Sequence, residues 1–146
     1  MINFVSGNIF ESKAEAIVNA VNTIGVMGKG IALEFKKRYP YNFKEYKTAC
    51  DNGELIIGTV LAVKETNGKT IVNFPTKQHW KDASKYEYVE MGLKALKDAI
   101  IRHNLNSIAL PALGCGLGGL KWEMVKQLID KELGLLAIEV FVYEPI

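Results

Sequence analysis

Apolar positions along the chain recur with two different spacings, one typical of strands and the other of amphipathic helices. Short apolar or alternating runs predict six strands, at residues 2–5, 16–19, 55–62, 69–74, 107–110 and 137–143. Helical spacing predicts four helices: one from about residue 30 that ends before Pro40, one over 41–51, one that follows Ser84, and one over 121–133. A short helical turn is predicted at residues 14–16.

Turn and capping signals set several of these boundaries. Asn67-Gly68 lies between two apolar runs and predicts a hairpin. Ser84 stands three residues before Glu87, the spacing of a capping box, so we expect it to open the third helix. Gly134 is the predicted C-terminal stop of the last helix. The apolar residues of the third helix at helical spacing are Val89, Leu93, Leu96 and Ile100.

Strands alternate with helices everywhere except at the hairpin, and this order predicts an α/β fold with a mixed, largely buried sheet. The 146 residues fit one domain, and no linker, repeat or low-complexity tract interrupts them. Ligands of such folds bind near the loops that follow the carboxyl ends of the strands. We therefore expect the functional residues in those loops.

Composition narrows the class of protein. Apolar residues make up 49% and charged residues 23% of the chain, an ordinary globular balance. No apolar run approaches the roughly 20 residues that a membrane span needs, and the first residues lack the features of an export signal. Cys50 and Cys115 are too few for a disulfide framework or a zinc site. We therefore expect a cytoplasmic protein without a metal or another cofactor.

The net charge is only +2, but the charged residues are unevenly distributed along the chain. Between residues 29 and 47 the chain has six basic residues and only two acidic ones. Such a local excess either attracts a phosphate-bearing partner or is the solvated face of a helix. Charge alone does not decide between these interpretations.

Two glycine-rich loops carry the strongest chemical signal. Residues 112–120 contain four glycines and lie between an apolar strand and a helix, and residues 25–30 contain three more glycines. Glycine lets backbone amides come close to an anion, so a strand, a glycine-rich loop and a helix can form a phosphate cradle. Neither loop fits the nucleoside-triphosphatase or dinucleotide-binding pattern. We expect the two loops to hold a diphosphate from opposite sides.

Three stretches together resemble the macrodomain family of ADP-ribose-binding modules: Asn19-Ala-Val-Asn22, the loop from Gly25 to Ala32, and Leu113-Gly-Cys-Gly-Leu-Gly-Gly-Leu120. The resemblance implies a single macrodomain over residues 1–146, a three-layer α/β/α sandwich around a mixed, mostly parallel sheet. More narrowly, residues 22–32 and 73–80 resemble the macrodomains of the DarG antitoxins, a branch related to the human terminal ADP-ribose glycohydrolase. Members of this branch remove ADP-ribose, and DarG removes it from thymidine in DNA, where the toxin DarT places it.

The resemblance implies a role for each part of the cleft. It implies that the diphosphate and proximal ribose are bound by Leu113, Gly114, Cys115, Gly116 and Leu117, and by the turn of Gly28, Lys29 and Gly30. Asn8 and Ile9 lie at the adenine end, where many macrodomains have an aspartate in place of Asn8. The resemblance also implies that ADP-ribose contacts Asn19, Thr23 and Thr76. Asn22 faces the distal ribose and is assigned, with Lys77, to catalysis.

Lys77 follows the strand predicted at residues 69–74, and the resemblance makes it the main catalytic group. Its amine either attacks the anomeric carbon of the distal ribose in its uncharged form, or assists the departing base as an ammonium. Glycohydrolase relatives that use a lysine nucleophile pair it with an aspartate in the second glycine-rich loop. Gly118 stands at that position here, and this difference favours the activity on DNA.

Side chains near Lys77 and in the second loop leave alternatives open. His79 either orients the substrate and transfers a proton or is a surface histidine. Trp80 either stacks on a nucleobase or packs under its loop. Backbone amides around Cys115 would favour a thiolate, but without a histidine nearby in sequence we interpret Cys115 as a small packing residue.

We therefore expect an ADP-ribosyl glycohydrolase that removes ADP-ribose from thymidine in DNA and reverses a DarT-type toxin. Two alternatives remain: a hydrolase of ADP-ribose esters, and a module that binds ADP-ribose without turning it over. The expected partners are ADP-ribose, ADP-ribosylated single-stranded DNA and a DarT-type toxin. We expect a monomer that does not bind a membrane.

Overall fold

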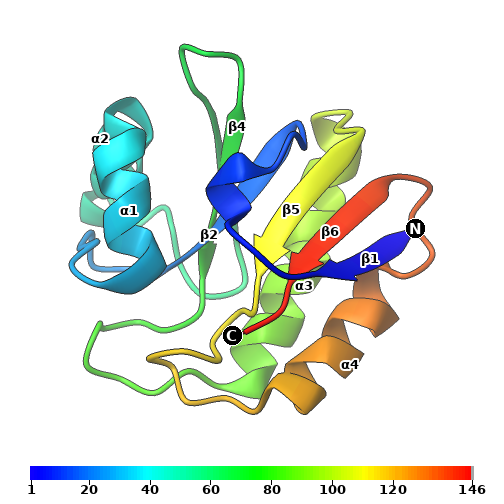
Figure 1. The fold of residues 1–146 in the computed structure, drawn as a ribbon. Helices are drawn as coiled ribbons and strands as arrows, with labels where there is room; N and C mark the ends of the chain where they lie inside the picture. Colours follow the sequence, from blue (N-terminus) through cyan, green and yellow to red (C-terminus); the bar gives the residue numbers. More distant parts are fainter. Residues whose placement is uncertain (146) are drawn as a thin grey trace.

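The computed structural model describes residues 1–145 as a six-stranded sheet with helices on both faces (Figure 1). The strands are β1 (Ile2–Val5), β2 (Ala16–Val21), β3 (Leu61–Lys64), β4 (Thr70–Pro75), β5 (Ser107–Pro111) and β6 (Glu139–Tyr143). The helices are α1 (Gly30–Arg38), α2 (Pro40–Asp51), α3 (Tyr86–Arg102) and α4 (Trp122–Leu133), and a 3₁₀ turn, η1, spans Ile9–Glu11. Within residues 1–145, none of the helices combines the length and apolar character that a membrane crossing requires.

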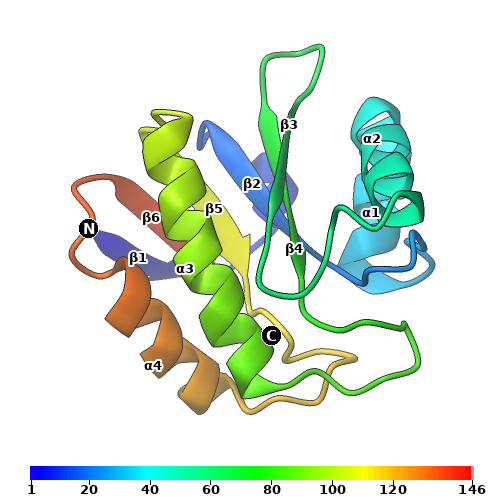
Figure 2. The same cartoon turned by 180° about the vertical axis from the view of Figure 1, so that it is seen from behind.

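The helices cover the sheet in pairs. α3 and α4 lie on one face (Figure 2), and α1 and α2 lie on the other, near β2 and β3 (Figure 1). The first pair buries a cluster that includes all four apolar residues predicted from the helical spacing of α3. The second pair buries a cluster that contains Phe35 and Tyr46. Two helical layers around a mixed sheet confirm the predicted α/β/α sandwich.

The strand order is β1-β6-β5-β2-β4-β3, and every neighbouring pair is parallel except β3 and β4. The antiparallel pair is the hairpin that Asn67-Gly68 predicted. Parallel pairing brings the carboxyl ends of β2, β4 and β5 to the same edge of the sheet. The loops that follow them, 22–29, 76–85 and 112–121, therefore meet at this edge, which is the lower one in Figure 1.

β2 pairs with its two neighbours to different extents. Against β4 the pairing covers all six residues of β2, from Ala16 to Val21. Against β5 only Ala16 and Ile17 are paired, although β2 continues to Val21. The backbone hydrogen bonds between β2 and β5 therefore end before the strands do, and the sheet opens toward its carboxyl edge.

Two predicted boundaries are wrong. Residues 14–16 form no helical turn; the turn lies earlier, at η1, where Asn8 Oδ1 accepts a hydrogen bond from Phe10 N at 3.0 Å. The strand predicted at residues 55–62 is confined to β3. Thr59 Oγ1 accepts from Ile56 N at 3.1 Å and thereby holds the preceding residues in a turn.

The capping box predicted at the start of α3 is also wrong. α3 begins at Tyr86, with Lys85 as its N-cap and no side-chain capping bond. Ser84 N instead donates to Gly118 O at 3.0 Å, which fixes Ser84 against the glycine-rich loop rather than the helix end. Gly134 does end α4, but with a φ of −62° that any residue can adopt.

α3 approaches β4 closely at one glycine. A β-carbon on Gly92 would lie 2.4 Å from Cζ of Phe74, whose side chain is fully buried. This distance is shorter than a contact between two carbon atoms allows. The spacing between helix and sheet therefore depends on the absence of a side chain at position 92.

We expect Gly92→Ala to lower the free energy of unfolding by about 1–3 kcal/mol, because the added methyl group overpacks a filled core. Urea denaturation measures the change. In a Phe74→Leu background the same substitution should cost less, since the colliding ring edge is gone. An equal loss of unfolding free energy in both backgrounds would contradict the close contact between position 92 and the Phe74 ring.

Candidate active site

The loop that follows β4 is hydrogen-bonded to the loops on both sides of it. Thr23, in the β2 loop, donates to Gln78 O from its N–H at 3.0 Å and from Oγ1 at 3.1 Å. Near its other end, Ser84 N donates to Gly118 O at 3.0 Å. Site residues that are far apart in the sequence therefore share one region, with the Lys77 loop between the two glycine-rich loops.

The 112–121 loop presents backbone amides that have no internal acceptor. Its own hydrogen bonds use the N–H groups of residues 115, 119 and 120. Among the other amides of the loop, those of Gly114, Gly116, Leu117 and Gly118 donate to no acceptor in residues 1–145. Closely spaced amides without acceptors in a turn form a concave site for an anion. Such a turn can hold a phosphate.

A second set of amides faces this loop. α1 begins at Gly30, so the amides of its first turn lack an intrahelical acceptor and carry the positive end of the helix dipole. Gly28 and Lys29 immediately precede them. The β-carbon position of Gly30 lies 4.0 Å from Cδ1 of Leu117, whose side chain is 71% exposed. The two glycine-rich loops therefore approach each other across the strand ends.

Asn19 and Asn22 turn their side chains into the protein. Asn22 is 5% exposed; its Nδ2 donates to Val26 O at 2.8 Å, and its Oδ1 accepts from the Tyr46 hydroxyl at 2.8 Å. Asn19 is fully buried on β2, with Nδ2 3.7 Å from Met27 Sδ and Oδ1 without a partner in the described chain. Asn22 thus shapes the loop that lines the site.

The residues expected at the adenine end follow β1, whose carboxyl end lies at the same edge of the sheet. Asn8 is exposed, and its Oδ1 caps η1, which leaves a second lone pair on that oxygen. Ile9 is buried beside it. Thr76 is buried at the end of β4, where its N–H donates to Val21 O at 2.9 Å.

Lys77 is half-buried, and its Nζ donates to Trp80 O at 3.3 Å. The Trp80 side chain is 46% exposed, and its ring centre lies 5.3 Å from that of His79 and 5.2 Å from Lys81 Nζ. His79 Nδ1 accepts from Lys81 N at 3.1 Å, which places the proton of the neutral imidazole on Nε2. One loop therefore groups an amine, an imidazole and an exposed indole.

Gly118 has no room for a side chain. A β-carbon there would lie 2.2 Å from Ser84 Oγ and 2.5 Å from Gly114 O. Ser84 is itself buried, and its hydroxyl has no hydrogen-bond partner within residues 1–145. A carboxylate at position 118 would require both Ser84 and the loop backbone at Gly114 to move. The loop therefore brings no acid to this position near Lys77.

Residues 18–129 match the family model of the Macro domain. The chain belongs to the macrodomain family. It is 49% identical over 150 residues to a DNA ADP-ribosyl glycohydrolase of Thermus aquaticus, in a match that covers 100% of this chain and 42% of the relative. The solved macrodomain of Thermus aquaticus DarG is 49% identical, with a TM-score of 0.95 and 99% of each chain covered.

Two further relatives extend the comparison. Thermosipho africanus DarTG, solved in complex with ADP-ribose, is 35% identical with a TM-score of 0.93, over 99% of this macrodomain and 42% of that chain. Human ADP-ribose glycohydrolase OARD1 is 27% identical over 143 residues, covering 97% of this chain and 90% of the relative. The predicted relation to DarG and to the human enzyme is confirmed. The chain spans 42% of the length of the bacterial relatives that are named as DNA ADP-ribosyl glycohydrolases, alone or fused to a transferase.

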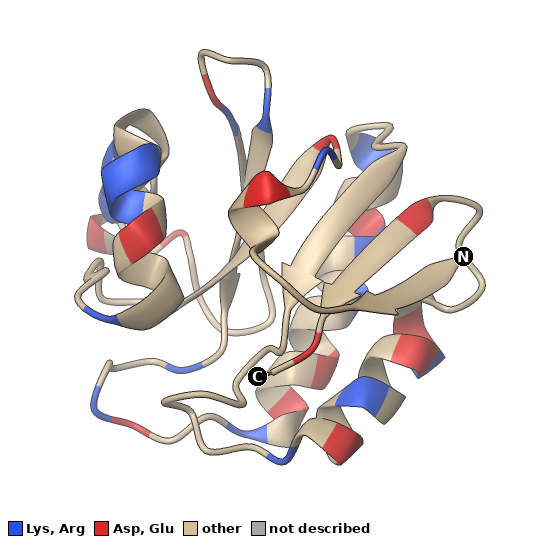
Figure 3. Ribbon diagram, in the orientation of Figure 1, with Lys and Arg blue, Asp and Glu red and all other residues tan. Residues whose placement is uncertain are grey.

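Basic residues gather on the strand-end loops of the macrodomain. The loops 22–29, 76–85 and 112–121 contain one acidic residue, Asp82, and most of their charged segments are blue in Figure 3. Their basic residues are Lys29, Lys77, Lys81, Lys85 and Lys121. The positive potential of such a group attracts an anionic ligand and its phosphate-bearing surroundings.

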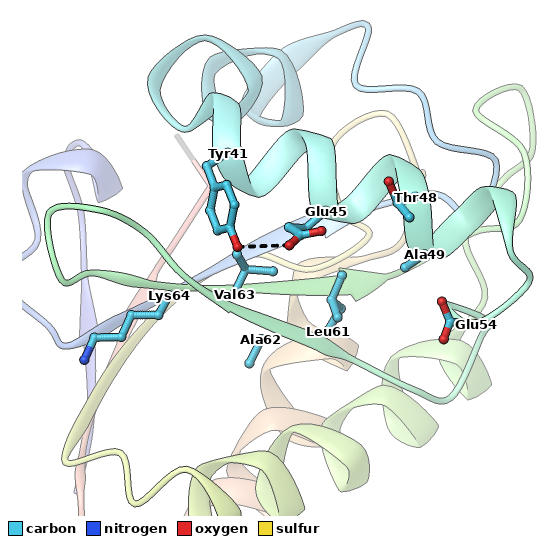
Figure 4. Close-up of a pocket in the computed structure, with 9 residues that line it drawn as sticks. All are labelled: Tyr41, Glu45, Thr48, Ala49, Glu54, Leu61, Ala62, Val63 and Lys64. Carbon is cyan, nitrogen blue, oxygen red and sulfur yellow. Dashed lines mark hydrogen bonds between the residues drawn. The ribbon is translucent and has the colours of Figure 1, made fainter.

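A hollow of about 420 Å³ lies between α2 and β3 (Figure 4). Tyr41 and Glu45 of α2 face Val63 across it, and the Tyr41 hydroxyl donates to Glu45 Oε1 at 2.9 Å. None of the predicted site residues lines this hollow. Over residues 1–145, no three His, Cys, Asp or Glu side chains gather to hold a metal ion.

Sequence reasoning missed two residues that shape the macrodomain's site. Tyr46 is predicted only as part of a helix face, and Ser84 only as a helix cap. Their partners, Asn22 and Gly118, lie in other loops, and Tyr46 is 24 residues from Asn22. No local spacing carries a signal for contacts of this range.

Cys115 is not an activated thiol. Its Sγ donates to Leu113 O at 3.6 Å, and the residue packs against the buried cluster under α3 and α4. Burial raises the pKa of the Cys115 thiol to about 11. The loss of solvation thus outweighs the amides that would favour a thiolate.

Alkylation of Cys115 by iodoacetamide at pH 8 should be about 100-fold slower in the folded than in the urea-unfolded protein. A pKa of about 11 rather than 9 leaves about 100-fold less thiolate at this pH. The folded rate should increase up to about pH 11, because deprotonation supplies the nucleophile. Mass spectrometry of the quenched peptide measures both rates, and equal rates at pH 8 would contradict the raised pKa.

Proposed function

We propose that this macrodomain is an ADP-ribosyl glycohydrolase that removes ADP-ribose from thymidine in DNA. The observation that carries the proposal is the placement of Lys77. Its loop is hydrogen-bonded to Thr23 on one side and to Gly118 on the other, between the two sets of amides that suit a diphosphate. A diphosphate bound there would bring the distal ribose toward the loop that carries the amine.

Binding and chemistry fall to different parts of the site. The amides of the two glycine-rich loops hold the diphosphate, Asn8 and Ile9 take the adenine, and Asn22 maintains the loop beside the distal ribose. Cleavage breaks the bond between the anomeric carbon and the thymine nitrogen, and water supplies the new hydroxyl group. Lys77 either attacks the anomeric carbon as an amine or protonates the departing base as an ammonium.

The crowding at Gly118 supports thymidine as the base that leaves. Without a carboxylate on that loop, Lys77 has no acid–base partner there. An imide nitrogen of thymine departs as a resonance-stabilised anion, so assistance from a single ammonium suffices. The 49% identity to a protein named as a DNA ADP-ribosyl glycohydrolase supports the same substrate.

The proposal includes the partners of this reaction. The substrate is ADP-ribosylated single-stranded DNA, and a DarT-type toxin is the enzyme that attaches the group. The similarity to DarTG solved with ADP-ribose supports both the ligand and the pairing with a toxin. We propose that the protein acts as a monomer in the cytoplasm.

Lys77→Ala should reduce the release of ADP-ribose from ADP-ribosylated single-stranded DNA by about 10²–10⁴-fold, the usual contribution of a positioned proton-transfer group. Chromatography of the released ADP-ribose over time measures the rate. Lys97→Ala removes an exposed lysine from α3, away from the strand-end loops, and should keep the wild-type rate.

The other outcomes of this experiment separate the alternatives. Equal release by wild type and Lys77→Ala would exclude the catalytic role of Lys77. Turnover of ADP-ribosyl-glutamate or O-acetyl-ADP-ribose, without turnover of the DNA conjugate, would identify an ester hydrolase. Calorimetric binding of ADP-ribose without turnover of any conjugate would identify a binding module.

We also propose that His79 and Trp80 contact the DNA strand next to the modified base. The Trp80 ring is exposed, it lies within three residues of Lys77, and Lys81 adds a positive charge beside it. An exposed aromatic ring with neighbouring basic groups is the usual platform for a single-stranded base. The strand would then be held beside the catalytic amine.

Trp80→Ala should raise the KM for an ADP-ribosylated oligonucleotide about 5- to 150-fold, because stacking of one base contributes about 1–3 kcal/mol. It should leave the KM for ADP-ribosylated thymidine nucleoside unchanged, since that substrate has no neighbouring base. Trp80→Phe should retain most of the affinity. Tyr41→Ala, which removes a 45% exposed ring from α2, is the matched control. Equal effects on both substrates would indicate that Trp80 packs the loop instead.

A further inference from the structure

The segment of residues 22–26 is held in shape by the side chain of its first residue. Asn22 Nδ2 donates to Val26 O at 2.8 Å. Asn22 Oδ1 accepts from Ile24 N at 3.1 Å and from Val26 N at 3.4 Å. Because these contacts replace the hydrogen bonds of a regular turn, the loop keeps its shape only while the Asn22 side chain stays in place.

The Tyr46 hydroxyl holds that side chain from below. Tyr46 is fully buried on α2, and its hydroxyl oxygen lies 2.8 Å from Oδ1 and 2.9 Å from the backbone O of Asn22. Burial raises the pKa of Tyr46 well above its ordinary value, so the hydroxyl keeps its proton and acts as a donor. The side-chain Oδ1 and the backbone oxygen of Asn22 therefore both face one buried donor, the Tyr46 hydroxyl.

α2 is itself anchored to the hairpin and the sheet. Glu65, which follows β3, accepts from Asn42 N at 2.6 Å through Oε2, and this contact caps the start of the helix. The side chains of Asn42 and Asn73 exchange two hydrogen bonds, at 3.1 and 2.8 Å. Tyr46 therefore projects from a helix that is fixed by buried polar contacts.

The 22–26 segment in turn fixes two parts of the site. Thr23 donates twice to Gln78 O, the residue after Lys77. At its other end the segment leads through Met27, which is 1% exposed, into the amides of residues 28–30. A shift of Asn22 would consequently move both the amide loop and the loop of the catalytic amine.

We propose that Tyr46 is a positioning residue of the site, whose hydroxyl sets Asn22 and, through it, the 28–30 amides and the Lys77 loop. The part that concerns the ligand and Lys77 rests on the proposed function. The effect of Tyr46 on the shape of the 22–26 segment does not rest on the proposed function, and hydrogen exchange tests it separately.

Hydrogen exchange followed by NMR tests the control of the segment. Tyr46→Phe removes only the hydroxyl oxygen, and exchange at the Ile24 and Val26 amides should become about 5-fold faster, as expected for the loss of one hydrogen bond. Tyr39→Phe is the matched control, because Tyr39 is also buried but its hydroxyl makes no hydrogen bond within residues 1–145. Buried amides of α3 report whether either variant loosens the whole fold.

Ligand binding and turnover test the connection to the site. In Tyr46→Phe, the dissociation constant for ADP-ribose should rise about 5-fold, and kcat on the DNA conjugate should fall. Thr23→Val keeps the Asn22 contacts but removes one of the two hydrogen bonds to Gln78 O. It should lower kcat with little change in exchange at Ile24 and Val26.

Each outcome decides a separate point. Unchanged exchange in Tyr46→Phe, or equal acceleration in Tyr39→Phe, would overturn the role of Tyr46 in the segment. Faster exchange with unchanged ADP-ribose affinity would overturn its connection to the amides. If the wild type neither binds ADP-ribose nor turns over the conjugate, the proposed function fails, while the exchange data still judge the role of Tyr46.

Discussion

The geometry of the site depends on the unequal pairing of β2 with its two neighbours. The complete register with β4 places Val21 opposite Pro75, and beyond it Thr23 N donates to Gln78 O. The pairing with β5 stops after Ile17, which lets the sheet open between β2 and the strand that leads into the glycine-rich loop. One side of β2 thus fixes the loop that carries Lys77, and the other makes room for the ligand of the proposed function.

Most of the proposed binding surface consists of main chain. The amides of the two glycine-rich loops supply the donors for an anion, and the helix dipole of α1 adds to their potential. Main-chain donors have no rotamers to order when the ligand binds, but they depend on loops that keep one shape. The buried side chains of Asn22 and Tyr46 provide that shape for the 22–26 segment, which explains why polar groups lie beneath this loop.

The sequence predicts the elements of this fold better than the contacts between them. The apolar spacing of α3 and the Asn-Gly turn are local signals, and the core cluster and the hairpin follow them. The apolar run at 55–62 carries the same local signal, yet the hydrogen bonds of Thr59 override most of it. For Ser84, the capping spacing is present, but the contact with Gly118 decides its position. Tyr46 offers no local signal, because its role exists only once α2 lies against the β2 loop.

The contact between Ser84 and Gly118 also constrains how this site can evolve. Because a side chain at position 118 would collide with both Ser84 and the backbone oxygen of Gly114, it can arise only together with changes at both neighbours. The two positions are therefore epistatic, and the order of substitutions matters. Loss of the Ser84 hydroxyl, which has no partner within residues 1–145, would remove one of these collisions, whereas the collision with Gly114 O requires a shift of the loop backbone.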